Sequence, residues 1–174
     1  MTKSDSSVGV VYLGIDPGKK GALAAIYNEG QTVESWHVPM VSNEYNLRAM
    51  LQLLVKFQHL RKDGWRVETG IEEQNPRPTD SKHTAKMVGF SQGLWSMACA
   101  ANSLPFQVIS PRSWKPKYVA KGATKQESIL AAITIYPEVE LPLKKDEARA
   151  EAILIADYLM RMERKLNFPM RKIG

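Results

Sequence analysis

The chain has 174 residues and a formal net charge of +6, with 24 Lys and Arg against 18 Asp and Glu. This length suits a single domain over residues 1–174 with short flexible tails at about 1–8 and 167–174, and no apolar run reaches the ~20 residues of a membrane span. The one cysteine, Cys99, excludes an internal disulfide, and the basic balance favours a polyanionic partner.

The N-terminal part of the sequence predicts three strands. A nearly continuous apolar run at 10–15 is typical of a strand buried on both faces, and the turn sequence at 16–21 follows it. Two further strands are predicted at 22–27 and 32–38. Because tight turns join the three strands, they predict an antiparallel meander.

The hydrophobic pattern then changes to helices separated by strands. Apolar residues at helical spacing from Leu47 to Val55, including Leu51, predict a helix that Ser42 or Asn43 would cap. The other predicted elements are strands at 65–73 and 106–110 and helices at 87–101, 124–136 and 146–165. This order implies an α/β fold in which a mixed five-stranded sheet is flanked by helices, and it is similar to the order of the RNase H-like fold.

Acidic residues lie at the ends of several predicted elements, at Asp16, Glu72, Glu73, Asp146, Glu147 and Glu151. If the first and fourth strands are parallel neighbours, Asp16 and Glu72 emerge at the same sheet edge, where the last helix can add a carboxylate. Converging carboxylates repel one another unless cations neutralise them, and oxygen ligands suit Mg²⁺ or Mn²⁺. Two such ions ~4 Å apart can catalyse phosphodiester hydrolysis, so the pattern favours a nuclease.

The strand-end carboxylates also have ordinary explanations. Asp16 could be a turn residue, and Glu72 and Glu73 could be solvated charges at a strand end. Glu72 points away from Ile71, whose side chain should enter the core, and this favours Glu72 over Glu73 as a site residue.

The helix carboxylates leave a similar choice. Asp146 and Glu147 could merely stabilise the helix dipole. Glu147 and Glu151 share one helix face at i, i+4, whereas Asp146 shares it only if it precedes the regular helix. Glu151 is followed by small and apolar residues, which suits a packed face.

These segments resemble the motifs of RuvC-type Holliday-junction resolvases of the RNase H-like superfamily, and the phage and organelle branch in particular. The matching segments, in chain order, are 13–18, 71–76, 89–95, 111–115, 124–128 and 146–156. Any one match is weak, whereas several in the right order over nearly the whole chain are specific.

The resemblance implies Mg²⁺-dependent cleavage of four-way DNA junctions by a homodimer, with two ions per site, Mn²⁺ able to substitute and no nucleotide cofactor. The metal ligands that it implies are Asp16, Glu72, Asp146 and Glu151, with Glu147 and Glu73 as alternates. Lys125 would approach the scissile phosphate and Lys115 would contact the DNA. Further DNA contacts are expected from the basic residues Arg77, Lys82, Lys86, Arg112 and Lys121.

The sequence departs from the bacterial pattern at two places. The last acidic pair is spaced i, i+3 in the bacterial enzymes, whereas here the spacing to Glu151 is i, i+5 for Asp146 or i, i+4 for Glu147. The organelle pattern is similar to the wider spacing, so we place Asp146 first. The segment 75–80 is proline-rich and lacks the aromatic residue that follows the second motif in the bacterial enzymes, so the residue that opens the junction is not predicted.

Two other functions fit the same residues. One is an RNase H-like nuclease that acts on RNA–DNA hybrids or single strands, and the other is a catalytically inactive junction-binding protein. The expected location is the cytoplasm, that of the host if the protein is viral, or an organelle if a transit peptide was removed.

Overall fold

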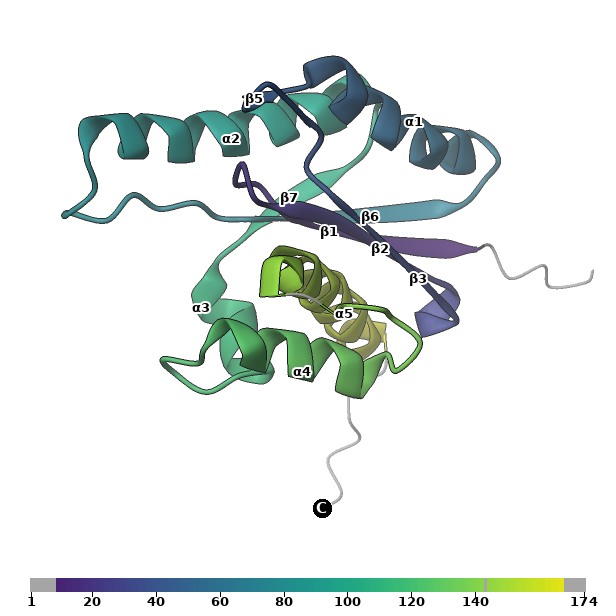
Figure 1. Cartoon of the computed structure of the whole chain (residues 1–174). Coiled ribbons are helices and arrows are strands. Elements are labelled where there is room, and N and C mark those ends of the chain that lie inside the picture. The colour runs from purple at the N-terminus through teal and green to yellow at the C-terminus, as the bar shows by residue number, and fades with distance from the viewer. Residues whose placement is uncertain (1–8, 143, 168–174) are drawn as a thin grey trace, which may run out of the picture.

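The computed structural model describes residues 9–142 and 144–167, and its centre is a five-stranded mixed sheet (Figure 1). The strand order is β3-β2-β1-β6-β7. The strands are β1 (Val10–Asp16), β2 (Ala22–Tyr27), β3 (Thr32–His37), β6 (Arg66–Glu72) and β7 (Phe106–Ile109). β2 runs antiparallel to β1 and β3, whereas β6 is parallel to both β1 and β7. The predicted meander and its two additional strands are therefore confirmed.

Helices cover both faces of this sheet. The helices are α1 (Leu47–Lys62), α2 (Lys82–Ala101), α3 (Pro111–Trp114), α4 (Lys125–Ile135) and α5 (Glu147–Asn167). Figure 1 shows α1 and α2 on one face and α5 on the other, with α3 and α4 outside α5. Each face has its own hydrophobic cluster, so β1, which contributes to both, is buried on both sides as predicted. No helix in the described part of the chain is long and apolar enough to cross a bilayer.

Helix α5 packs unusually close to β1 because the residue beneath it is Gly14. A Cβ atom at Gly14 would lie 2.0 Å from the carbonyl oxygen of Ala152 and 2.6 Å from the backbone nitrogen of Ala156. Small residues on both elements therefore bring the two backbones into contact. This contact places Glu151, the residue before Ala152, beside the end of β1.

The short elements were not predicted from the sequence. They are the hairpin β4 (Met40–Val41) and β5 (Glu44–Tyr45) and the 3₁₀ turns η1 (Asn28–Gly30), η2 (Lys115–Lys117) and η3 (Lys144–Asp146). Ser42 and Asn43 form the turn of the hairpin with φ of 47° and 61°, so neither caps α1. Asn46 is the cap instead, because its side chain accepts a hydrogen bond from the N–H of Ala49 at 3.1 Å.

The predicted apolar stripe of α1 was also partly wrong. Leu47 and Leu51 are 51% and 39% exposed, and the buried residues of this helix are Met50, Leu54 and Phe57. Helix α4 begins with a capping box, in which Thr124 and Glu127 exchange hydrogen bonds. The predicted flexible tails lie outside the described residues, except for Asn167, which is the last residue of α5.

Candidate active site

Two carboxylates lie side by side where β1 and β6 end. Parallel pairing sets Ile15 opposite Ile71, so the next residues, Asp16 and Glu72, are neighbours, as predicted. Ile71 enters the core on the α1–α2 face, and Glu72 points to the opposite face, where α5 lies. Glu72 is only 5% exposed. Glu73 follows the strand and is half-buried, so the structure favours Glu72 as the site residue.

Helix α5 and the segment after β7 complete the group. The ammonium nitrogen Nζ of Lys115 lies 2.9 Å from Oε1 of Glu151 and 4.0 Å from Oε1 of Glu72. The hydroxyl of Ser128 on α4 donates a longer hydrogen bond to Glu151, at 3.4 Å. Glu147 lies one helical turn before Glu151, on the same face. One lysine therefore stands among carboxylates that come from two strands and one helix.

Burial raises the pKa of the two carboxylates at the strand ends, Asp16 and Glu72. Burial, together with the negative charges of Glu151 and Glu147, raises the pKa of Asp16 to about 6 even though Lys115 acts in the opposite direction. Burial and the charge of Asp16 raise the pKa of Glu72 to about 8. Lys115 thus neutralises the group only in part.

The carboxylate side chains at this site are chemically suited to bind a divalent cation. Oε1 of Glu72 is buried and has no hydrogen-bond partner among the described residues, which leaves a carboxylate oxygen available as a ligand. Carboxylate oxygens are the donors that Mg²⁺ and Mn²⁺ prefer. Among the described residues no group of three or more acidic, histidine or cysteine side chains is arranged so that it could hold a metal ion. Metal binding therefore requires these side chains to regroup.

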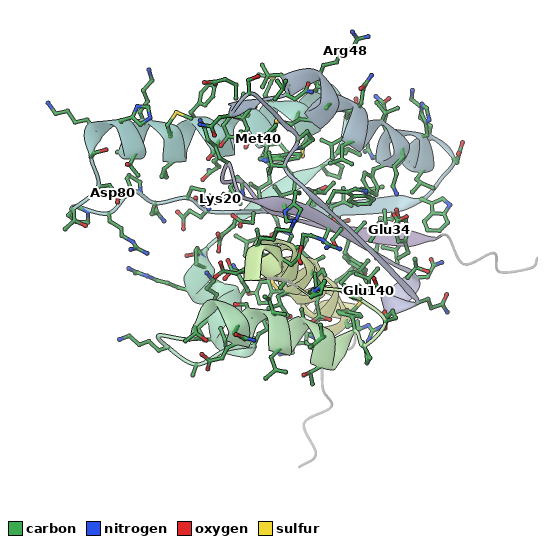
Figure 2. The ribbon with its side chains drawn as sticks, in the orientation of Figure 1. Lys20, Glu34, Met40, Arg48, Asp80 and Glu140 are labelled. Atoms are coloured by element: carbon green, nitrogen blue, oxygen red, sulfur yellow. The ribbon has the colours of Figure 1, made fainter. Side chains whose placement is uncertain are left out.

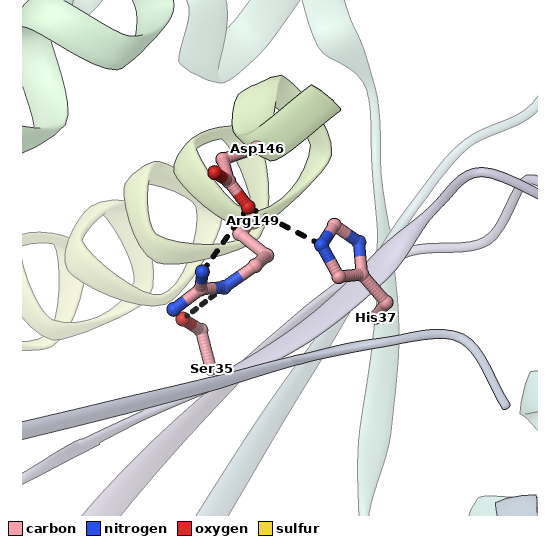
Figure 3. Close-up of polar contacts among 4 residues, drawn as sticks. All are labelled: Ser35, His37, Asp146 and Arg149. Carbon is pink, nitrogen blue, oxygen red and sulfur yellow. Dashed lines mark hydrogen bonds and ion pairs between the residues drawn. The ribbon is translucent and has the colours of Figure 1, made fainter. Parts of the chain in front are cut away.

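Asp146 makes different contacts from the other predicted ligands (Figure 3). Its Oδ1 accepts a hydrogen bond from Nη1 of Arg149 at 3.1 Å and lies 3.2 Å from Nε2 of His37. Asp146 ends η3, whereas Glu147 begins α5, and successive helical residues point about 100° apart. Glu147, whose charge acts on Asp16, is therefore better placed than Asp146 to join the carboxylate group.

The predicted cationic residues fall into two regions. Lys115 lines a cleft of about 510 Å³ together with other predicted residues, namely Arg112, Lys121, Glu147 and Glu151. Arg77, Lys82 and Lys86 are exposed on the β6–α2 connection and the start of α2. This connection, marked by Asp80, projects past the sheet edge (Figure 2). Lys125 is the first residue of α4, and its side chain lies outside the described part of the structure.

Sequence reasoning missed the contact of His37 with Asp146. Strand pairing aligns Asp16 with Ala22, and Ala22 with His37, so His37 ends its strand at the same sheet edge as the carboxylates. The predicted meander contained this signal, because antiparallel pairing across two short turns sets the alignment.

Several solved structures share this architecture. RuvC of Thermus thermophilus in complex with a Holliday junction substrate matches with a TM-score of 0.61 and 21% identity, over 90% of this chain and 96% of that chain. The chain has the RuvC fold. A second structure of T. thermophilus RuvC gives a TM-score of 0.56 and 22% identity, with 90% and 97% covered. The yeast mitochondrial Holliday junction resolvase Ydc2 gives 0.50 and 18%, with 94% and 83% covered.

The RuvC fold confirms the predicted RNase H-like architecture. No protein-family model matches the sequence, and the curated proteins give no significant match either. At 18–22% identity these structures share the fold, whereas the chemistry depends on the residues that the RuvC fold brings together in this chain.

Proposed function

We propose that the protein is a structure-specific DNA endonuclease that resolves four-way junctions by paired, metal-dependent phosphodiester hydrolysis. The observation that carries the proposal is the pairing of Asp16 and Glu72 at the ends of two parallel strands, beneath Glu151 of α5. Buried carboxylates with raised pKa values gain most from divalent cations, and a basic chain suits DNA. A RuvC fold, solved elsewhere with a Holliday junction, supports the choice of substrate.

Asp16 would be the central ligand because its charge interacts both with Glu72 and with the carboxylates of α5. Glu72, Glu147 and Glu151 would complete the coordination, with Asp146 and Glu73 as less favoured alternates. When bound, two Mg²⁺ ions, or Mn²⁺ in their place, would supply the activation of water and the stabilisation of the leaving oxygen. No nucleotide cofactor is needed for this hydrolysis.

The lysines would act on the phosphates. Lys115 already stands at the carboxylates and can offset negative charge on a phosphate that enters the site. Lys125, at the start of α4, is proposed to approach the scissile phosphate. The residues that would follow the DNA backbone are Arg77, Lys82, Lys86, Arg112 and Lys121.

A homodimer would match the symmetry of a junction, because two equivalent strands must be cut. Exposed apolar side chains suit such a contact. They lie on α2 and on the edge strand β7, at Phe90, Met97, Phe106 and Val108. The cytoplasm, or an organelle that contains DNA, stays the predicted location.

A synthetic four-way junction with end-labelled strands tests the proposal. We expect symmetric nicks in opposite strands with Mg²⁺ or Mn²⁺ and none with EDTA. Asp16→Asn should abolish cleavage and retain junction binding, whereas Asp63→Asn, an exposed aspartate just after α1, should cleave normally. Equal cleavage of linear duplex, RNA–DNA hybrid or single strands would contradict the junction specificity. Salt-dependent binding without cleavage in either metal would indicate an inactive junction-binding protein.

A further inference from the structure

A polar cluster ties the start of α5 to the edge strand β3 (Figure 3). Asp146 contacts His37 and Arg149 as described, and Nε of Arg149 also donates a hydrogen bond to Oγ of Ser35 at 3.0 Å. Ser35 and His37 belong to β3, whereas Asp146 directly precedes α5 and Arg149 is the third residue of that helix. We call these four residues the β3 clamp.

The β3 clamp lies at the same sheet edge as the candidate active site. Because Asp16, Ala22 and His37 are aligned across three neighbouring strands, His37 stands two strands from Asp16, about 10 Å away. Ala22 packs in the cluster on the α5 face, so this row of side chains faces α5. The first turn of α5 therefore spans the distance from the clamp to the carboxylates.

The helix has a second fixed point further along. Gly14 contacts the backbone of Ala152 and Ala156, which fixes α5 from that turn onward. The turn before it carries Glu147 and packs through Ala148 and Ala150, which are buried in the hydrophobic cluster on this face. Asp146 is 3% exposed, so its carboxylate is held inside the protein just before this turn, where its polar contacts add to the packing of the alanines.

We propose that Asp146 is a positioning residue: through the β3 clamp it holds the first turn of α5 so that Glu147 and Glu151 face Asp16. The inference rests on the proposed function, because it assigns these carboxylates to the metals. Both contacts described for Asp146 use Oδ1, so the β3 clamp engages this oxygen. A positioning role keeps the contacts and leaves metal binding to Glu147.

Replacement of Arg149 by an uncharged residue distinguishes this role from direct metal ligation, because the two roles predict opposite changes in Mn²⁺ affinity. Mn²⁺ binding to the full-length protein, without DNA, can be measured by electron paramagnetic resonance. If Asp146 were a ligand, Arg149→Met would remove a competing cation and tighten Mn²⁺ binding. If Asp146 positions the helix, Arg149→Met should weaken Mn²⁺ binding about tenfold and leave the number of bound ions unchanged. Loss of a residue that orients metal ligands typically lowers metal affinity by about this factor.

Three further variants complete the experiment. Ser35→Ala, which removes only one hydroxyl, should weaken Mn²⁺ binding, as Arg149→Met does. Asp146→Asn should retain much of the Mn²⁺ affinity that Asp146→Ala loses. Glu147→Gln should lower the number of bound ions, which Asp146→Ala should not. The double variant of Asp146→Ala and Arg149→Met should be no worse than either single change.

The possible failures are distinguishable. If the wild-type protein binds Mn²⁺ and Arg149→Met leaves binding unchanged or tighter, the positioning role is wrong and the proposed function stands. Loss of one ion in Asp146→Ala would also overturn the positioning role. A wild-type protein that binds no Mn²⁺ at millimolar concentration would overturn the proposed function and this inference with it.

Discussion

Lys115 and Glu151 form an ion pair within the candidate active site, with 2.9 Å between Nζ and Oε1. The lysine follows α3 and the glutamate lies on α5, so the pair joins two elements that are distant in the sequence. The carboxylate that Lys115 neutralises is one of those we assign to the metals. The ammonium and a divalent cation therefore compete for the same oxygen, and this competition can be measured.

Replacement of Lys115 by Met should increase the effect of Mg²⁺ on stability. In EDTA the carboxylates lose their counter-charge, so we expect the melting temperature to fall by about 2–4 °C, equivalent to about 1 kcal/mol in a chain of this size. Saturating Mg²⁺ should restore that loss and give a larger stabilisation than in the wild type. Lys121→Met, in the same cleft, is the matched control and should leave the Mg²⁺ effect unchanged. An unaltered Mg²⁺ effect in Lys115→Met would show that the lysine does not compete.

The metal-free protein should lose stability as pH rises. In the folded state the pKa of Asp16 is raised to about 6 and that of Glu72 to about 8, mainly by burial. Between the ordinary carboxyl pKa of about 4 and these values, the folded state binds more protons than the unfolded state, so the free energy of unfolding falls as pH rises.

Urea denaturation in EDTA at several pH values measures this slope. We expect a loss on the order of 1–3 kcal/mol from about pH 5 to about pH 8, and a larger stabilisation by Mg²⁺ at the upper end. The double variant of Asp16→Asn and Glu72→Gln should flatten the profile. Stability that rises over this range in EDTA would contradict the raised pKa values.

The main carboxylate pair could be predicted because it depends on strand ends alone. Asp16, which follows an apolar run, and Glu72, near the end of the predicted strand at 65–73, become neighbours once β1 and β6 pair in parallel. Alternation along β6 also favours Glu72 over Glu73, since a strand exchanges faces at every residue. The second step is local, whereas the first also requires β1 and β6, which are distant in the sequence, to pair in parallel.

The contribution of the last helix could not be predicted in the same way. Whether Asp146 or Glu147 faces the site depends on where η3 gives way to α5, and a shift of one residue turns a side chain by about 100°. The ion pair of Lys115 depends on α3 and η2, two short turns without any hydrophobic period. The exposure of Leu47 shows the related limit that a correct helical spacing does not say which residues another element covers.

A buried cluster around Asp157 should contribute strongly to stability. Asp157 is fully buried, accepts hydrogen bonds from Tyr118 at 2.6 Å and Tyr136 at 2.7 Å, and pairs with Arg161. The cluster ties α5 to the end of α4 and to the segment that follows Lys115. Removal of one tyrosine hydroxyl should cost about 1.5–3 kcal/mol, because each bond has a charged acceptor. Asp157→Ala should cost about 3–5 kcal/mol, because it leaves Arg161 and two hydroxyls without their acceptor.

Urea denaturation of Tyr118→Phe, Tyr136→Phe and Asp157→Ala checks these values. Tyr158→Phe, whose hydroxyl is outside the cluster, is the control and should change stability by less than about 0.5 kcal/mol. If Tyr136→Phe and Tyr158→Phe lowered the free energy of unfolding equally, the hydrogen bonds to Asp157 would not contribute strongly to stability.

Gly14→Ala should disturb the active site, although Gly14 itself takes no part in the reaction. The added methyl group would meet backbone atoms of α5 at 2.0 and 2.6 Å, and backbone cannot rotate away as a side chain can. Helix α5 must therefore move off β1, which we expect to cost about 3 kcal/mol or more, at the upper end of overpacking effects. The same displacement moves Glu151 away from Asp16, so stabilisation by Mg²⁺ should also decrease. Gly18→Ala is the matched control, because its Cβ would meet nothing closer than 3.9 Å. Wild-type stability together with a wild-type Mg²⁺ effect in Gly14→Ala would show that the close contact of α5 with β1 does not position the carboxylates.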